Sequence, residues 1–231
     1  MSNMDFSLIL KHMDILLLGT KLTIIMTIGA ITIGVILGTL LGLMRVSRSG
    51  ILKGIAAVYL QIFRGTPMLL QICFLYFAIP SLTSALGMPF SWSNPLLPDA
   101  ALAGIIALGL NSGAYIAEII RSGIQGVDIG QTEAARALGL NHTQTMQLII
   151  LPQAFRRVIP PLCNEFIVLL KDTSLVSAIG AKELMYQARA MGAKYYEYFV
   201  FMIGAAVVYF CLTFIFTRIA NYIERRLAVS D

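Results

Sequence analysis

The sequence predicts an all-α integral membrane protein with five transmembrane helices. Of the 231 residues, 58% are hydrophobic and only 13% are charged, whereas a soluble domain carries about 25% charged residues. Long uncharged segments alternate with short basic ones, and a helix needs roughly 20 apolar residues to cross a bilayer. We therefore expect a single membrane domain and no second domain.

Five segments are long and apolar enough to be taken as spans. They are expected at residues 22–44, 56–79, 100–121, 158–177 and 198–217. The second contains Pro67, which removes a backbone hydrogen bond and is expected to kink the helix. The fourth is the least apolar, because it holds Glu165, Lys171 and Asp172. The N-terminus has no basic region and no small-residue cleavage site, so the first segment is expected to be a retained span.

The first span carries glycines at one face. Gly34, Gly38 and Gly42 recur once per helical turn, and small residues allow two helices to approach closely in a membrane. Two interpretations are open: packing within one subunit, or an interface between subunits.

The distribution of basic residues predicts the orientation. With the N-terminus outside, inner segments hold eleven Lys and Arg residues and outer segments hold five. The inner ones are Arg45, Arg48, Lys53, Arg64, Arg121, Arg136, Arg156, Arg157, Arg218, Arg225 and Arg226, and the outer ones are Lys11, Lys21, Lys182, Arg189 and Lys194. The positive-inside rule therefore predicts an extracytoplasmic N-terminus and a cytoplasmic C-terminus.

A polar stretch at residues 130–152 separates the third and fourth spans and is predicted to lie in the cytoplasm. Residues 132–138 favour a short helix that Gly139 ends. Asn141 is expected to cap a second helix, with Gln144 three residues on, and Pro152 to end it. By form alone this helix-turn-helix is a connector. A DNA-reading role is disfavoured because both ends are tied to the membrane.

No catalytic or metal-binding pattern is present. The sequence lacks a G-x-x-x-x-G-K-[ST] loop, so we expect the chain to bind no ATP and no other cofactor, and it also lacks zinc-hydrolase and serine-hydrolase motifs. Its modest net charge of +5 suits anionic lipid better than nucleic acid. The three cysteines lie in apolar stretches without metal spacing.

Polar residues inside the predicted spans are the candidates for a substrate pathway. Glu165 is costly in a membrane unless it faces a cavity or a partner, so it either contacts a cationic group of a solute or pairs with a base or a donor on another helix. Asn111, Ser112 and Tyr115 either bond neighbouring helices or contact solute. Two apolar residues, Met68 and Ile72, are expected to be packing residues or pathway walls.

Several motifs together resemble the permease subunits of ATP-driven (ABC) importers. The residues Glu133-Ala134-Ala135, then Gly139, then Ile149, Leu151 and Pro152 match the EAA signature of that family. Arg64-Gly65-Thr66-Pro67, Gly113-Ala114-Tyr115 with Glu118 to Arg121, and Asn164-Glu165-Phe166 are similar to its polar amino acid branch.

This resemblance implies the type I importer transmembrane domain and the import of a polar amino acid, with cationic ones among the candidates. It implies that the EAA stretch docks on a separate ATPase, with Glu133 offering a carboxylate and Ala134 and Ala135 permitting close approach. The implied partners are two ATPase subunits that bind ATP-Mg, a second permease copy or paralogue, an extracytoplasmic amino-acid-binding protein and membrane lipid.

We therefore expect residues 1–18 to form an extracytoplasmic segment, residues 19–220 the transport domain and residues 221–231 a cytoplasmic tail. Two other classes of membrane protein are alternatives. A secondary transporter usually shows paired repeats with broken helices, and no such repeat is apparent in five spans. A membrane scaffold would need no polar residues along a pathway.

Overall fold

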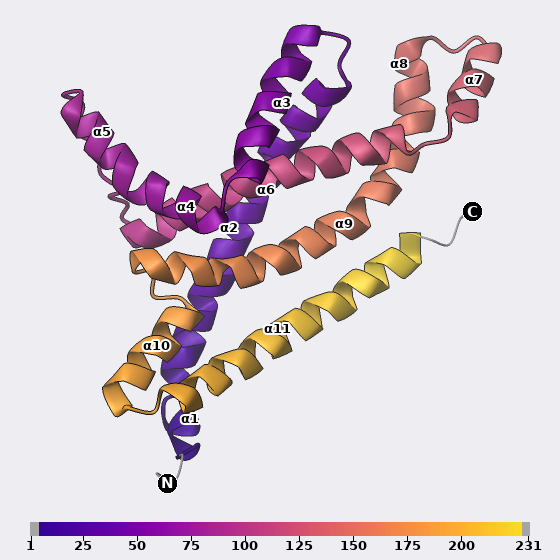
Figure 1. The fold of residues 1–231 in the computed structure, drawn as a ribbon. Helices are drawn as coiled ribbons and strands as arrows, with labels where there is room; N and C mark the ends of the chain where they lie inside the picture. The colour runs from indigo at the N-terminus through magenta and orange to yellow at the C-terminus, as the bar shows by residue number, and fades with distance from the viewer. Residues whose placement is uncertain (1–4, 228–231) are drawn as a thin grey trace.

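The computed structural model describes residues 5–227, and every regular element in that part of the chain is helical. The all-α prediction is confirmed (Figure 1). The α-helices are α1 (Ser7–Lys11), α2 (Met13–Val46), α3 (Gly50–Gly65), α4 (Met68–Cys73), α5 (Ile79–Ala85), α6 (Asp99–Gln125), α7 (Ile129–Ala137), α8 (His142–Thr145), α9 (Leu151–Asp172), α10 (Leu184–Tyr195) and α11 (Tyr198–Leu227). The π-helical turns Phe74–Ala78 and Met146–Ile150 and the 3₁₀ helix Thr173–Ile179 join some of them.

Helices α2 and α6 form the centre of the molecule and approach closely through glycines on both sides. A Cβ atom at Gly38 of α2 would lie 2.6 Å from Cβ of Ile116 on α6, and one at Gly109 of α6 would lie 2.7 Å from Cβ of Ile33 on α2. Each helix thus receives a branched side chain of the other where its own side chain is missing. The glycine face of the first span therefore packs within the chain, which was one of the two interpretations left open.

The predicted second span, residues 56–79, is not one helix. Helix α3 ends at Gly65, and Thr66 and Pro67 are extended, with φ/ψ of −120°/148° and −63°/135°. A proline disfavours the helical region for the residue before it, and Thr66 is accordingly extended, so the chain breaks here instead of kinking. The apolar helical segment that follows runs over Met68–Ala85.

Four helical segments of the described chain are long and apolar enough to cross a membrane: Met13–Val46, Met68–Ala85, Asp99–Gln125 and Tyr198–Leu227. Helix α9, the fourth predicted span, is not among them, although its 22 residues reach about 33 Å. It starts seven residues earlier than expected, at Leu151, and carries Arg156 and Arg157 near that end. The first and last spans are also longer than predicted, and only residues 228–231 of the predicted tail lie outside the described chain.

The sequence predicted that Pro152 ends a helix, and the structure contradicts this prediction. The short helix α8 continues through the π-helical turn Met146–Ile150 into α9, whose first turn contains the proline. The amide of Leu151 donates to the carbonyl of Met146, so the wider turn lies directly before Pro152. Because the first turn of an α-helix tolerates a missing N–H, the proline fits there.

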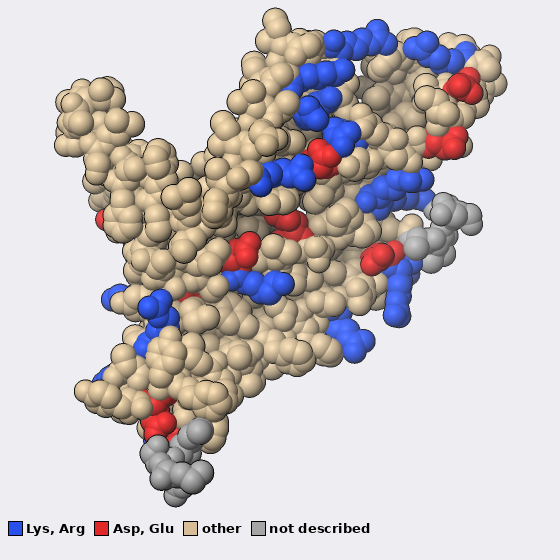
Figure 2. All heavy atoms as spheres, viewed as in Figure 1, with Lys and Arg blue, Asp and Glu red and all other residues tan. Residues whose placement is uncertain are grey.

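The elements divide between two ends of the molecule. Helices α3, α7 and α8 lie at one end, and the N-terminus lies at the opposite end (Figure 1). Lys and Arg side chains gather over the end that carries α3, α7 and α8 (Figure 2). This charge asymmetry is the one on which the predicted orientation was based.

Candidate functional site: a coupling element and a polar membrane pathway

The polar stretch between α6 and α9 folds as the predicted helix-turn-helix. The Asp128 carboxylate accepts a hydrogen bond from the amide of Gly130 at 2.7 Å and caps α7. Gly139 has φ +82°, and the amide of Leu140 donates to the carbonyl of Ala135 at 3.1 Å, which closes the end of α7. Asn141 and Gln144 form the expected capping box, with bonds of 2.9 and 3.0 Å.

Most of the EAA residues face outward. Glu133, Ala134 and Gly139 are exposed, whereas Ala135 is only 4% exposed. Ala135 therefore packs inside the chain, and it is Ala134 that leaves room for a partner to approach. The exposed Leu138, at 83%, adds an apolar contact surface that sequence reasoning did not single out.

The helix-turn-helix of α7 and α8, named the coupling element here after its expected role, is held on the membrane helices by a small apolar cluster. Val127, Ile150 and Ala154 are buried together, and partly buried Ile124 and Met146 pack against them. The amide of Gln153 on α9 also donates to Gln131 on α7 at 3.3 Å. The cluster joins the end of α6 to the π-helical turn and the start of α9, and the Gln131–Gln153 bond joins α7 to α9.

The predicted pathway residues Ser112 and Glu165 are brought together. The Ser112 hydroxyl on α6 donates to Oε1 of Glu165 on α9 at 2.8 Å. Ser112 is fully buried and lies against Gly34 of α2, which has no side chain to occupy that space. In the described chain neither Lys171 nor Arg64 forms an ion pair with Glu165, so its partner is a neutral donor on another helix.

Asn111 points to a different place, the break between α3 and α4. Its amide nitrogen donates to Oε1 of Gln71 at 2.9 Å and to the carbonyl of Phe63 at 3.1 Å. Gln71 in turn donates to the carbonyl of Phe63 at 2.8 Å and to the hydroxyl of Thr66 at 2.7 Å. The break exposes carbonyls that would be unsatisfied in the membrane, and these two amides satisfy them. Gln71 was missed, although a polar residue four positions after Pro67 was the available signal.

The remaining pathway candidates are spread along the same region. Tyr115 is 40% exposed, and the Arg64 guanidinium lies over its ring at 5.4 Å from the centroid. Met68 is partly buried against the main core, and Ile72 is fully buried in it. Ile72 is therefore a packing residue in this structure, and its alternative role as a wall has no exposed surface to support it.

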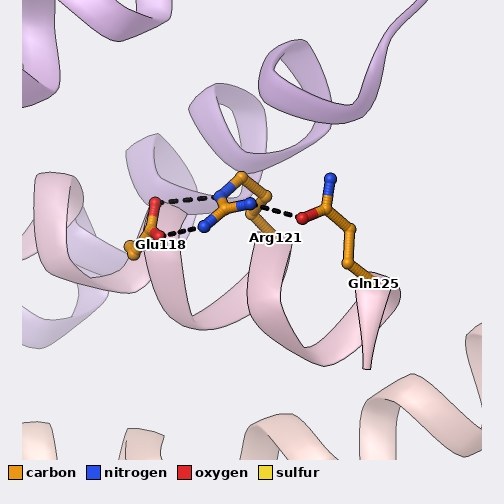
Figure 3. Close-up of polar contacts among 3 residues, drawn as sticks. All are labelled: Glu118, Arg121 and Gln125. Atoms are coloured by element: carbon orange, nitrogen blue, oxygen red, sulfur yellow. Dashed lines mark hydrogen bonds and ion pairs between the residues drawn. The ribbon is translucent and has the colours of Figure 1, made fainter. Parts of the chain in front are cut away.

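Glu118 and Arg121, three residues apart on α6, form an ion pair. The Arg121 guanidinium bonds both carboxylate oxygens of Glu118 and also the amide oxygen of Gln125 (Figure 3). Bidentate pairing with a carboxylate is the strongest contact that arginine makes. The charge of Glu118 is therefore already matched within its own helix.

A second buried carboxylate was not anticipated. Glu183 is fully buried at the start of α10. It accepts from the Tyr209 hydroxyl at 2.7 Å and from the amides of Met185 and Tyr186 at 2.9 and 2.8 Å, and the Thr23 hydroxyl lies 3.5 Å away. Glu183 therefore caps the N-terminus of α10.

A helical membrane domain with polar contacts between its spans and an exposed helix-turn-helix at its basic end defines a transport permease. The sequence matches the family of binding-protein-dependent transport system inner membrane components over residues 30–229, and the chain belongs to that family. It is thus the membrane component of an ABC import system, whose ATPase is a separate subunit, and it is not itself an enzyme.

Individual relatives cover almost the whole chain. The arginine transport system permease protein ArtQ of Bacillus subtilis (strain 168) is 38% identical over 229 residues, covering 99% of this chain and 100% of that protein. The glutamine transport system permease protein GlnP of Escherichia coli (strain K12) is 35% identical over 225 residues, covering 97% and 98%.

Solved structures show the same fold. A crystal structure of an amino acid ABC transporter with histidines superposes with a TM-score of 0.87 at 40% identity, covering 97% of this chain and 99% of that one. The MetNI methionine transporter in an inward-facing form superposes with a TM-score of 0.75 at 22% identity, covering 94% and 98%. The fold is therefore that of the type I importer transmembrane domain.

Proposed function

We propose that this chain moves a polar amino acid across the cytoplasmic membrane and that Glu165 contacts the cationic part of the solute. The observation that carries the proposal is the Ser112–Glu165 pair, a half-buried acid on α9 with one neutral hydrogen-bond donor. The two relatives described above transport arginine and glutamine by name, so the amino acid class agrees with this chemistry.

The energetics favour a charged partner for Glu165. An acid among membrane helices is costly unless a cavity, cation or donor offsets its desolvation. One neutral hydroxyl satisfies only part of a carboxylate, which has about four acceptor sites. The free acceptor capacity of Glu165 is available to the ammonium or guanidinium group of a passing amino acid.

We further propose that two permease copies, identical or paralogous, line the pathway above two ATPases that bind ATP-Mg, and that a binding protein delivers solute from outside. The chain itself would bind no cofactor. Glu133, Ala134 and Gly139, with Ala135 supporting them from inside, would form the contact with the ATPase. In this arrangement the N-terminus is extracytoplasmic and the C-terminus cytoplasmic, in agreement with the gathering of basic residues around α3, α7 and α8 (Figure 2).

The substitution Glu165→Gln tests the role of the acid. The amide oxygen can still accept from Ser112, so a melting temperature close to that of the parent is expected. Loss of the charge should weaken transport of arginine by about 10- to 100-fold in apparent affinity, because a charge-assisted hydrogen bond contributes about 1.5–3 kcal/mol. Transport of glutamine should fall less.

Uptake is measured in proteoliposomes that contain the permease and ATPase, with binding protein added, beside a melting curve of the complex. Glu224→Gln, at an exposed acid of α11, is the matched control and should change neither quantity. A Glu165→Gln variant that melts early, or that carries arginine as well as the parent does, would show that the acid serves the scaffold only.

A further inference from the structure

A cavity of about 510 Å³ opens between the C-terminal halves of α3 and α6. Its lining includes Arg45 from the end of α2, Gln61 and Arg64 from α3, and Tyr115 and Glu118 from α6. None of these residues forms part of the Ser112–Glu165 pair, and the coupling element contributes none of them.

The charges in this cavity are unbalanced. Glu118, the acid of the lining, is held by Arg121 in a bidentate pair (Figure 3). Arg45 and Arg64 make no ion pair with any carboxylate in the part of the chain that the structure describes. The buried Nε of Arg45 also has no hydrogen-bond partner there. Two guanidinium groups therefore face the cavity with donors left over, and guanidinium geometry favours oxyanions.

The position of the cavity on α3 separates it from the lipid. Ile51, Ile55, Val58 and Ile62 form one exposed apolar stripe along this helix, as expected for the side that faces acyl chains. Gln61 and Arg64 lie on another side of the helix, so the cavity opens away from that stripe. In the proposed orientation, a solute passes this side of the molecule on its way to or from the cytoplasm.

We infer that this cavity is an exit site, in which Arg45 and Arg64 bind the carboxylate of the amino acid on the cytoplasmic side. The inference rests on the proposed function, since it takes the solute to be an amino acid and this end to be cytoplasmic. Glu165 and the two arginines then recognise opposite ends of a zwitterion at successive positions. A site of this kind is filled by accumulated product, and a filled exit site slows further import.

The test compares solutes with and without a carboxylate inside proteoliposomes whose lumen represents the cytoplasm. The permease–ATPase complex is reconstituted with ATP in the lumen, and uptake of labelled arginine or glutamine is followed after addition of binding protein. The lumen is preloaded with arginine or its decarboxylated form agmatine, or with glutamine or its decarboxylated form 4-aminobutyramide. We expect the carboxylates to slow uptake and the amines to do so much less.

Arg64→Gln should raise the luminal concentration needed for half inhibition by about tenfold or more, the size expected for one charge-assisted hydrogen bond. Arg64→Lys should restore part of the effect. Arg48→Gln, at an exposed basic residue of the α2–α3 connection outside the cavity lining, is the matched control and should leave the inhibition unchanged. If Arg64→Gln does not assemble with the ATPase, Arg45→Gln carries the same expectation.

Several outcomes would overturn the inference while leaving the proposed function intact. Uptake that responds equally to arginine and agmatine would do so, and so would equal shifts in Arg64→Gln and Arg48→Gln. A third is inhibition that depends on phosphatidylglycerol content or on luminal inorganic phosphate but not on the amino acid carboxylate, which would assign the oxyanion site to phosphate. Absence of any amino acid uptake would instead overturn both proposals.

Discussion

At the scale of single residues, polar side chains of the membrane region bond groups that would otherwise lack a hydrogen-bond partner. Ser112 meets an acid, whereas Asn111 and Gln71 meet carbonyls that the chain break has freed. Sequence position alone could not separate these roles, because Asn111 and Ser112 are adjacent polar residues, and the helix that each one faces is set by the fold. The candidate for contact with the solute is the Ser112–Glu165 pair, because the carboxylate of Glu165 can accept further hydrogen bonds.

The close contact between Gly38 of α2 and Ile116 of α6 gives a residue-scale prediction for stability. Gly38→Ala would place a Cβ 2.6 Å from both Cβ and Cγ2 of Ile116, atoms too near the α6 backbone to move easily. Overpacking of this kind costs about 1–3 kcal/mol, so the melting temperature should fall by several degrees.

Gly54→Ala is the control for this change, because nothing lies within 4 Å of a Cβ at Gly54. Alanine is favoured over glycine in a helix by about 1 kcal/mol, so that variant should melt at the same temperature as the parent or higher. Equal melting of Gly38→Ala and the parent would argue against the tight α2–α6 contact.

At the scale of elements, Glu183 fastens α10 to α11 and lies beside α2. Tyr209→Phe removes the hydroxyl that donates to the buried carboxylate at 2.7 Å. A hydrogen bond to a charged group contributes about 1.5–3 kcal/mol, so thermal stability should fall measurably. Tyr222→Phe, on the exposed part of the same helix, should change the melting temperature little. The reverse order of the two variants would contradict the anchoring role of Glu183.

The coupling element gives a functional prediction. Gly139→Pro replaces a residue with φ +82° whose amide donates to the carbonyl of Arg136. Proline cannot adopt a positive φ and has no N–H with which to donate this hydrogen bond. We expect normal membrane insertion but loss of coupling between ATP hydrolysis and uptake, or loss of ATPase assembly. Glu133→Arg should do the same by reversing an exposed charge.

The control for Gly139→Pro is Gly87→Pro. Gly87 also has positive φ, +73°, and its amide donates to the carbonyl of Ser84, but it follows α5, outside the coupling element. ATPase activity and uptake measured on the same proteoliposomes distinguish the two positions. Coupling that survives Gly139→Pro and Glu133→Arg together would remove this role from the EAA stretch.

How far the sequence predicts each element depends on how local its signals are. The turn at Gly139 and the capping box at Asn141 and Gln144 were predictable, since their partners lie within a few residues. The prolines were less informative. Pro67 breaks the chain whereas Pro152 is accommodated after a π-helical turn. The break at Pro67 is supported by a contact from a distant helix, the bond from Asn111 of α6 to the carbonyl of Phe63, which the local sequence does not reveal.

At the scale of the whole molecule, orientation is the property on which the proposals depend. Ser91→Cys should be labelled by an impermeant thiol reagent from outside and Gln144→Cys only from inside, since both residues are exposed in the structure. Both variants are made in a protein whose native Cys73, Cys163 and Cys211 have been replaced. This cysteine-free protein, which should not be labelled, is the control. The opposite pattern would separate the EAA stretch from any cytoplasmic ATPase.

The reciprocal glycine contacts of α2 and α6 bear on how such a domain transmits force. An axial shift of one residue, about 1.5 Å, would drive Ile116 and Ile33 out of the gaps left by Gly38 and Gly109 and into neighbouring side chains. The packing of α2 against α6 therefore resists sliding of one helix along the other. We therefore expect α2 and α6 to move together, and we expect changes in access to arise where a helix is interrupted, as at Thr66 and Pro67.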